Sequence, residues 1–198
     1  IADSIRRLGV SQSGDQIRGY EGEAARTYFS VFDRMIRSER EEFRFSGRVR
    51  RPPIGRTNAL LSFLYALLLN DCVAACEGVG LDPQVGFLHA IRPGRPALAL
   101  DLFEEFRAYI ADRLVLTLIN RQQLRANDFE ILPGGAARLT DAARKRVVVA
   151  YQERKRVEVN HPVLGRAVPI GIVPHVQAQL LARHLRGDLA AYPPFRAR

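Results

Sequence analysis

Apolar residues recur every three or four positions along most of this chain, a spacing that is typical of amphipathic helices. The most apolar stretch covers residues 58–79, where leucine, alanine and cysteine leave few polar positions on any side. Such a helix is expected at the centre of a fold. The same periodicity predicts further helices over residues 16–42, 98–121, 140–157 and 172–189. We therefore predict an all-α fold.

Proline and glycine clusters separate these helices, because proline lacks an amide donor and both residue types favour turns. Thr57 is expected to cap the start of the central helix. Two short apolar runs around Pro133-Gly134-Gly135 predict one small β-hairpin within residues 129–139. Residues 162–169 begin and end with proline, so they are expected to break the chain before the last helix.

The chain has 198 residues and is 47% hydrophobic, which suits one sizeable domain and is short for two. No apolar run reaches the roughly 18–20 residues of a membrane span. The longest run, residues 60–69, contains Ser62 and Tyr65. The chain starts at Ile1, with neither an initiator methionine nor a signal peptide. We therefore expect a cytoplasmic protein with no membrane partner, and a chain whose N-terminal part is missing.

Cys72 and Cys76 lie four residues apart within the central helix. Helical neighbours at this spacing rarely form a disulfide, and buried free thiols are common in cytosolic proteins. A zinc site would need a second Cys or His pair at matching spacing, which the sequence lacks. The two thiols are therefore interpreted as core residues.

Positive charge is concentrated near the end of the chain, which has a net charge of +9 in total. Residues 138–198 contain twelve Lys or Arg against four Asp or Glu. Only Lys145 and Lys155 among the 30 basic residues are lysine, and the guanidinium fork suits phosphate oxygens. A genome rich in arginine codons would explain the excess of arginine but not its uneven placement. Nucleic acid and a merely basic surface both remain open as interpretations.

The helix predicted over residues 140–157 is expected to carry basic side chains on its outer side: Arg144, Lys145, Arg146, Arg154, Lys155 and Arg156. Arg144, Lys145 and Arg146 are the candidates for DNA contacts there. Arg18 and Arg26, on the first predicted helix, are two further candidates. A basic face of this kind would bind phosphates with salt-dependent and largely sequence-neutral affinity.

A histidine and two carboxylates follow one another closely in the middle of the chain. His89 precedes a loop rich in proline and glycine, and Asp101 and Glu104 follow it on the next predicted helix. Residues three apart share a helix face, so the two carboxylates can converge. Spacing alone leaves two interpretations open, a metal site or a structural histidine beside an ordinary helix start.

Glu21 lies beside the apolar stripe of the first predicted helix, with Gly19 and Gly22 on either side. Glycine within a helix costs roughly 1 kcal/mol relative to alanine, so close approach of a ligand or another backbone is one explanation. A buried ion pair with Arg18 or Arg26 is the other. Together with His89, Asp101 and Glu104, this carboxylate could bind Mg²⁺ or Mn²⁺, which prefer oxygen ligands, with imidazole also accepted by Mn²⁺.

Three stretches of the sequence resemble the CRISPR-associated spacer integrase and endonuclease family, the first and nearly universal CRISPR-associated protein. They are EGEAARTYF at residues 21–29, RPP at 51–53 with NALLSFLY at 58–65, and GFLH at 86–89 with LALDLFEEFR at 98–107. Their order matches the family over roughly residues 15–160. One departure is Gly55, which stands where the family motif usually has an acid.

The resemblance implies that residues 1–198 form a helical C-terminal catalytic domain whose basic, DNA-facing section covers about 138–198. It also implies that a β-rich N-terminal dimerisation domain is absent from this chain. The implied metal ligands are Glu21, His89 and Glu104, and Asp101 is either an additional ligand or an acid that supports them. The implied cofactor is Mg²⁺ or Mn²⁺.

The implied function is that of a metal-dependent DNA endonuclease and integrase of CRISPR adaptation. Such an enzyme joins the 3′-hydroxyl ends of new spacer DNA to the repeat by transesterification at phosphorus. Its implied partners are double-stranded DNA, a second copy bound through the absent N-terminal domain, and a second small adaptation subunit. The alternative is a non-catalytic helical module that binds DNA or acts as a scaffold.

Overall fold

The computed structural model describes residue 6 and residues 13–196 of the chain. Two compact units are present, the first formed by residues 1–62 and 116–140 and the second by residues 63–115 and 141–198. The mostly helical fold predicted from the sequence is confirmed, with two small antiparallel sheets among the described residues. Each unit has its own set of buried apolar side chains, and each is described separately below.

The first long helix, α2 (Gly14–Phe32), begins after Ser13, whose hydroxyl accepts the amide of Gln16. The prediction that this helix continues to residue 42 is wrong. A short 3-10 turn, η1 (Asp33–Met35), follows α2 directly. The carboxylate of Asp33 accepts the backbone N–H of Phe45 at 2.7 Å, so the chain turns back along α2 and does not extend it.

Aromatic packing explains why the chain turns back at this point. The rings of Phe32 and Phe45 lie 5.1 Å apart between centroids, and those of Phe29 and Phe45 lie 5.8 Å apart. All three side chains are buried, and burying a phenylalanine contributes about 1.5–3 kcal/mol. A straight helix over residues 16–42 would leave Phe45 without these partners.

The predicted small hairpin is confirmed in the first unit. Strands β1 (Phe129–Ile131) and β2 (Ala137–Leu139) pair antiparallel, and the turn η4 (Pro133–Gly135) connects them. Gly55 donates its amide to the carbonyl of Gly135 at 3.0 Å. Its φ of +77° belongs to the left-handed region, where a residue with a Cβ would be strained. A glycine therefore suits this position in the present chain.

Helix α3 (Arg56–Gly78) contains the apolar stretch expected at the centre of the fold. Its buried residues recur at helical spacing: Leu60, Leu61, Leu64, Leu68, Cys72, Ala75 and Cys76. The helix is long and apolar enough to cross a membrane by length and composition alone, which a buried core helix also satisfies. Thr57 does not cap it as predicted, because its hydroxyl donates to the carbonyl of Phe43 at 2.6 Å.

The predicted helix over residues 98–121 is divided into three parts, of which the first two lie in the second unit. Helix α4 (Ala97–Phe106) leads into a π-helix, η2 (Arg107–Asp112), and α5 (Arg113–Asn120) follows. The side chain of Asp112 is fully buried and accepts a hydrogen bond from the hydroxyl of Tyr65 at 2.5 Å. Periodicity did not predict the π-helix, because it is a short segment of i→i+5 hydrogen bonds within a longer helix.

Helix α6 (Asp141–Lys155) confirms the next predicted helix, but two of its basic residues do not face outward as expected. Arg154 donates to the carbonyl of Tyr109 at 2.9 Å, and its guanidinium lies 5.1 Å from the centre of that ring. Lys155 pairs with Asp71 at 2.9 Å. Both side chains are partly buried within the second unit, so they stabilise the fold rather than form an outer surface.

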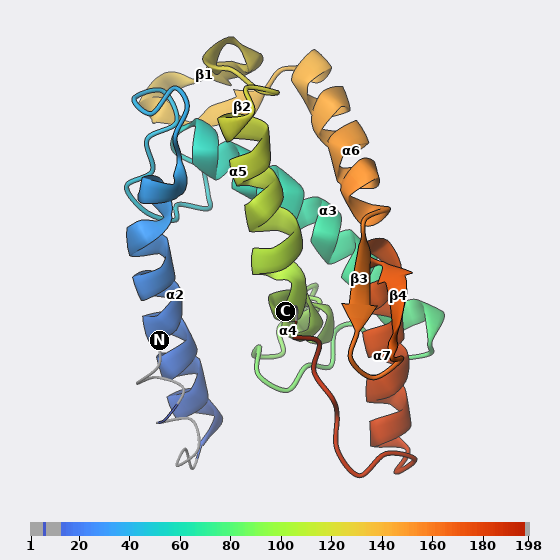
Figure 1. Ribbon diagram of the computed structural model, residues 1–198. Coiled ribbons are helices and arrows are strands. Elements are labelled where there is room, and N and C mark those ends of the chain that lie inside the picture. The colour runs from blue at the N-terminus through green and yellow to red at the C-terminus, as the bar shows by residue number, and fades with distance from the viewer. Residues whose placement is uncertain (1–5, 7–12, 197–198) are drawn as a thin grey trace. The chain divides into compact units, whose positions relative to one another are not determined.

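A second hairpin, which the sequence did not predict, follows α6 in the same unit (Figure 1). Strands β3 (Glu158–His161) and β4 (Arg166–Pro169) pair antiparallel, and the amide of Gly165 closes the turn by donating to the carbonyl of His161. Residues 162–169 separate the two helices as expected, although half of the segment forms β4. A 3-10 turn, η5 (Ile170–Ile172), then leads into α7 (Val173–Leu185), which packs against α4.

Candidate metal centre

The loop that ends at His89 is held by a single carboxylate on α4. Asp101 accepts the backbone amides of Phe87, Leu88 and His89 at 2.6, 3.0 and 2.9 Å. It also contacts the His89 ring, with 2.7 Å between Oδ1 and Nδ1. Four hydrogen bonds to one carboxylate fix both the backbone of the loop and the orientation of the imidazole.

The same loop is attached to the first turn of α4 by backbone contacts. The carbonyl of Pro83 accepts the amides of Leu98 and Ala99, which would otherwise lack partners at the helix start. Gly86 lies so close to this turn that an added Cβ would be 2.6 Å from the carbonyl carbon of Ala97. Only glycine fits at this position, which explains the first residue of the GFLH motif.

His89 is thereby prepared to bind a ligand through one ring nitrogen. Because Asp101 engages Nδ1, the Nε2 atom is the one that remains, and no side chain or backbone group in the described part of the chain bonds to it. A histidine that binds a metal commonly donates its other N–H to a carboxylate in this way. The side chains of His89 and Asp101 are 17% and 15% exposed, so the ring edge is accessible while the pair is shielded.

Glu104 lies one turn along α4 from Asp101. Its carboxylate forms an ion pair with Arg107 at 2.8 Å, and its side chain is 27% exposed. This exposure distinguishes Glu104 from a core residue. An imidazole nitrogen and a carboxylate oxygen are donors that a hard divalent cation accepts, so His89 and Glu104 fit a metal by their chemistry.

Glu21, the third predicted ligand, lies on α2 in the first unit and is partly exposed. A Cβ added to Gly19 or Gly22 would meet no atom within 4 Å, which leaves open space around this segment of α2. Within residues 6 and 13–196, no three His, Cys, Asp or Glu side chains are close enough to hold a metal ion. The set of Glu21, His89 and Glu104 therefore stays a prediction.

Asp101 was expected to be either a metal ligand or a supporting acid, and its contacts favour the second role. Both oxygens already accept hydrogen bonds from the loop, so Asp101 positions His89 and the loop backbone. Sequence spacing could not distinguish these roles, because it places Asp101 and Glu104 on one helix face without giving the partner of either.

A second polar cluster surrounds Glu105, the residue that follows Glu104 on α4. The sequence patterns did not indicate this cluster. Glu105 accepts hydrogen bonds from the Tyr192 hydroxyl at 2.5 Å, from Gln177 Nε2 at 3.1 Å and from the backbone amide of Phe195 at 2.8 Å. Burial raises the pKa of Glu105 above its ordinary value, although these three donors oppose the shift. We call Glu105, Gln177, Tyr192 and Phe195 the tail cluster.

His161 belongs beside the tail cluster and is not available to a ligand. Its Nε2 atom lies 3.1 Å from Gln177 Oε1, and its Nδ1 atom accepts the amide of Leu164 at 3.3 Å. The ring stacks on Phe195 with 5.8 Å between ring centroids, and the side chain is 1% exposed. His161 is therefore a structural histidine, in contrast to His89.

The basic residues predicted to contact DNA lie on the surface of their helices. Arg26, Lys145 and Arg146 are exposed, and Arg18 and Arg144 are exposed and pair with Asp15 and Asp141 on the same helix. These ion pairs lie between exposed groups, so they are weak and easily exchanged for phosphate contacts. The role of these residues in binding DNA stays a prediction.

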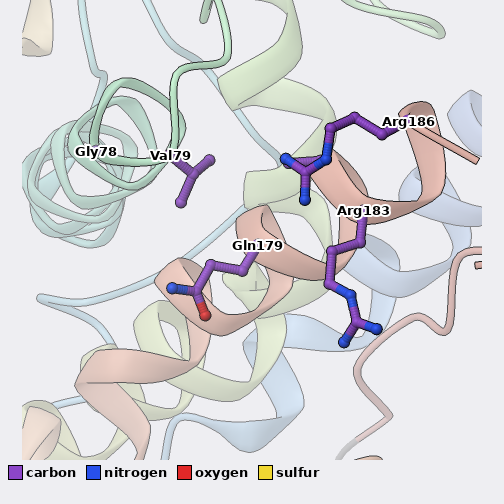
Figure 2. Close-up of a pocket in the computed structure, with 6 residues that line it drawn as sticks. Gly78, Val79, Gln179, Arg183 and Arg186 are labelled. Atoms are coloured by element: carbon purple, nitrogen blue, oxygen red, sulfur yellow. The ribbon is translucent and has the colours of Figure 1, made fainter. Parts of the chain in front are cut away.

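A further basic surface lies around a hollow of about 360 Å³ in the second unit, which sequence reasoning did not single out. Figure 2 shows Gln179, Arg183 and Arg186 on and just after α7, opposite Gly78 and Val79 at the end of α3. Arg186 pairs with Asp188 at 3.1 Å, and Arg183 is exposed. The three-residue spacing of the two arginines was the signal that could have indicated this surface.

The fold is mostly helical, and its second unit carries the oriented His89 imidazole and the partly exposed Glu104 carboxylate. These features define a candidate divalent-metal centre. The family model described as CRISPR associated protein Cas1 matches residues 1–153. The chain therefore belongs to the Cas1 family, and the resemblance identified from the sequence motifs is confirmed.

The chain is similar to named relatives over nearly its whole length. The CRISPR-associated endonuclease Cas1 1 of Moorella thermoacetica is 60% identical over 195 residues, which are 98% of this chain and 57% of that protein. A solved casposase bound to integration product is 29% identical with a TM-score of 0.85, and the match covers 96% of this chain and 53% of that one. A partial Cas6-RT-Cas1–Cas2 complex is 25% identical with a TM-score of 0.83, over 100% of this chain and 57% of that one. The chain thus spans about half the length of these proteins.

Proposed function

We propose that this chain is the catalytic part of a metal-dependent DNA endonuclease and integrase that joins 3′-hydroxyl ends of spacer DNA to a CRISPR repeat. The observation that carries the proposal is the fixed His89 ring, whose Nδ1 faces Asp101 and whose Nε2 remains for a ligand. The names of the relatives support the reaction class, since one is an endonuclease and another is bound to an integration product.

In this proposal Glu21, His89 and Glu104 hold Mg²⁺ or Mn²⁺. When bound, the cation would lower the pKa of the attacking hydroxyl and neutralise charge on the phosphoryl oxygens. Asp101 keeps the proton of His89 on Nδ1 and fixes the angle of the ring. Arg107 holds Glu104 in place through their ion pair.

The basic surfaces then hold the DNA backbone against this centre. Arg144, Lys145 and Arg146 on α6 and Arg183 on α7 are exposed and can contact phosphates without sequence preference. We also propose double-stranded DNA, a second copy of the protein and a small Cas2-like subunit as partners, because a similar chain was solved in a Cas6-RT-Cas1–Cas2 complex. A protein that acts on cellular DNA would work in the cytoplasm.

The strand-transfer activity of the His89→Ala variant tests the proposal. Removing His89 deletes the oriented metal-binding nitrogen, so strand transfer in Mn²⁺ is expected to fall to background while binding of duplex DNA remains. The matched control is His175→Ala, because His175 is exposed on α7 and contacts Gln179 rather than a carboxylate. An unchanged rate in His89→Ala would refute the assignment of this site.

The alternative is a non-catalytic DNA-binding module, for which the exposed arginines of α6 and α7 would be sufficient. Thermal unfolding with and without Mn²⁺ separates the two functions. A metal site that forms should raise the midpoint of unfolding, and a chelator should reverse the rise. No rise at saturating Mn²⁺, together with normal DNA binding, would support the module.

The basic face of α6 can be tested through the salt dependence of DNA binding. Reversing the charge of Arg144, Lys145 and Arg146 together is expected to weaken binding and to lower the slope of log K against log salt. The slope should fall by about 0.9 for each phosphate that these side chains no longer neutralise. An unchanged slope would show that this face is only hydrated.

A further inference from the structure

The helix that carries Glu104 leads into one wide turn, and the spacing of its buried residues explains why. One row of buried side chains recurs at intervals of four residues: Leu102, Phe106, Ile110 and Leu114. In a regular α-helix each such step passes a full turn by about 40°, so the row would wind away from the core. The π-helix η2 lies within this run, and its wider turn takes up the excess.

The position of this wide turn decides which way Glu104 points. Glu104 lies three residues before η2 begins at Arg107, and its carboxylate pairs with Arg107 at 2.8 Å. If η2 closed into a regular α-turn, the preceding helix would rotate by several tens of degrees relative to the residues that follow. The orientation of Glu104 therefore depends on the contacts that hold η2 in its wide form.

Tyr65 on α3 contacts both ends of this segment within the second unit. Its ring packs edge-on against Phe103, the residue before Glu104, with 5.3 Å between ring centroids. Its hydroxyl donates to Oδ1 of Asp112, the last residue of η2, at 2.5 Å. One side chain with few rotatable bonds thus connects the turn that carries Glu104 to the far end of the wide turn.

The burial of Asp112 indicates that this contact does more than fill the core. Its side chain is 0% exposed, whereas the other buried residues of α4 and η2 are apolar. A carboxylate loses its hydration on burial, and an apolar residue of similar size would pack there without that cost. Asp112 therefore favours one arrangement of the helix, the one that brings Oδ1 to the Tyr65 hydroxyl.

A second contact holds the middle of η2. Arg154 on α6 donates to the carbonyl oxygen of Tyr109 at 2.9 Å, and its guanidinium lies over the Tyr109 ring. Side chains from two other helices thus fix the wide turn at its middle and at its end.

We infer that Tyr65 and Asp112 are positioning residues of the metal centre. Their buried hydrogen bond holds η2 in its wide form and thereby keeps Glu104 turned to bind the cation. They act through the helix and not by contact with the cation. This inference rests on the proposed function and adds a support to the same centre.

The affinity of the Tyr65→Phe variant for Mn²⁺, measured by titration calorimetry, tests the inference. The change removes the hydroxyl and keeps the ring against Phe103. The affinity is expected to fall on the order of tenfold, the lower end of the effect of losing a supporting partner. Hydrogen exchange of the amides of residues 107–113, followed by NMR without metal, should become faster in the same variant.

Tyr151→Phe is the matched control. Tyr151 also donates its hydroxyl to an aspartate within the second unit, with 2.7 Å to Oδ2 of Asp71, and its side chain is 2% exposed. Both variants lose one hydrogen bond between a tyrosine and an aspartate, so both should lower the midpoint of urea unfolding. Tyr151→Phe should leave Mn²⁺ affinity and hydrogen exchange in η2 unchanged.

The inference is overturned if Tyr65→Phe binds Mn²⁺ as tightly as wild-type chain, or if it loses affinity while exchange in η2 stays unchanged. Equal losses of affinity in both variants would overturn it too, because they would reflect stability alone. In each of these cases wild-type chain still binds Mn²⁺, so the proposed function stands. Failure of wild-type chain to bind Mn²⁺ would instead refute the proposed metal centre and this inference with it.

Discussion

Two polar clusters lie one turn apart on α4, and each contains a carboxylate and a histidine. They differ in whether the histidine keeps a ring nitrogen without a protein partner. Around Asp101, the carboxylate fixes a loop and a histidine whose second nitrogen has no protein partner within the described chain. Around Glu105, the carboxylate, Gln177 and His161 satisfy one another, and Phe195 covers them. The first cluster is open to a ligand, and the second is closed.

One cluster is open and the other closed because the two carboxylates bond to different segments of the chain. Asp101 meets a loop whose amides need acceptors, so binding them leaves the His89 ring edge exposed. Glu105 meets the last described segment of the chain, whose hydroxyl, amide and aromatic ring exclude water. A histidine beside an acid therefore indicates a ligand site only where one ring nitrogen lacks a hydrogen-bond partner. When both ring nitrogens are bonded, the histidine has a structural role.

The largest expected effect comes from opening the closed cluster with Phe195→Ala. Phe195 is 5% exposed and contacts the rings of Phe106, Tyr109 and His161. Removing a buried phenylalanine side chain costs about 3–5 kcal/mol. Urea unfolding should show a loss of that size. A loss below about 1 kcal/mol would mean that the tail does not close the cluster.

The alkylation rate of Cys76 measures how well the core of the second unit excludes water. Burial raises the pKa of this thiol from 9.0 to about 11, with a smaller contribution from Glu77. Since only the thiolate reacts, the thiolate fraction at pH 8 is about a hundredfold lower than for an ordinary cysteine, and it rises as the pH approaches 11. Alkylation of native chain should be at least that much slower than alkylation in urea. Equal rates would show that water reaches the core.

Asp101→Asn should weaken the open cluster without unfolding the chain. The amide keeps one acceptor oxygen but loses the charge and adds a donor that faces backbone amides. Loss of such a supporting partner typically lowers metal affinity 10–100-fold. Titration calorimetry with Mn²⁺ checks this. Glu105→Gln is the matched control and should lower stability while leaving Mn²⁺ affinity within about twofold; the reverse pattern would contradict the assigned roles.

The smallest effect is expected from Tyr192→Phe. This change removes the hydroxyl that donates to Glu105 and accepts from Gln177, and it leaves the ring in place. One such hydrogen bond contributes about 1–3 kcal/mol when its partner stays buried. The midpoint in urea should shift by less than in Phe195→Ala. A larger shift would mean that the polar contacts, rather than the aromatic packing, hold the tail.

Local pattern predicted much of the fold. The apolar stripe of α3, the helix α6 and the hairpin of β1 and β2 follow from periodicity and turn residues within short windows. Strands this short carry little alternation: β1 and β2 were predicted from the Pro133-Gly134-Gly135 turn, whereas residues 162–169 were interpreted only as a break, so β3 and β4 were not predicted. The end of α2 at Phe32 was missed because it depends on Phe45, which is thirteen residues away and has no helical spacing to it.

The sequence by itself determined that Asp101 and Glu104 share one turn of a helix and that His89 precedes a loop that no helix can enter. Helical geometry and proline chemistry act between near neighbours, so these features need no distant partner. Only the tertiary structure decided that Asp101 binds the loop, that Glu105 meets Tyr192 and that Arg154 and Lys155 turn inward. Those choices depend on which donors folding brings to each carboxylate or carbonyl, across 80 residues or more in the case of Glu105 and Asp71.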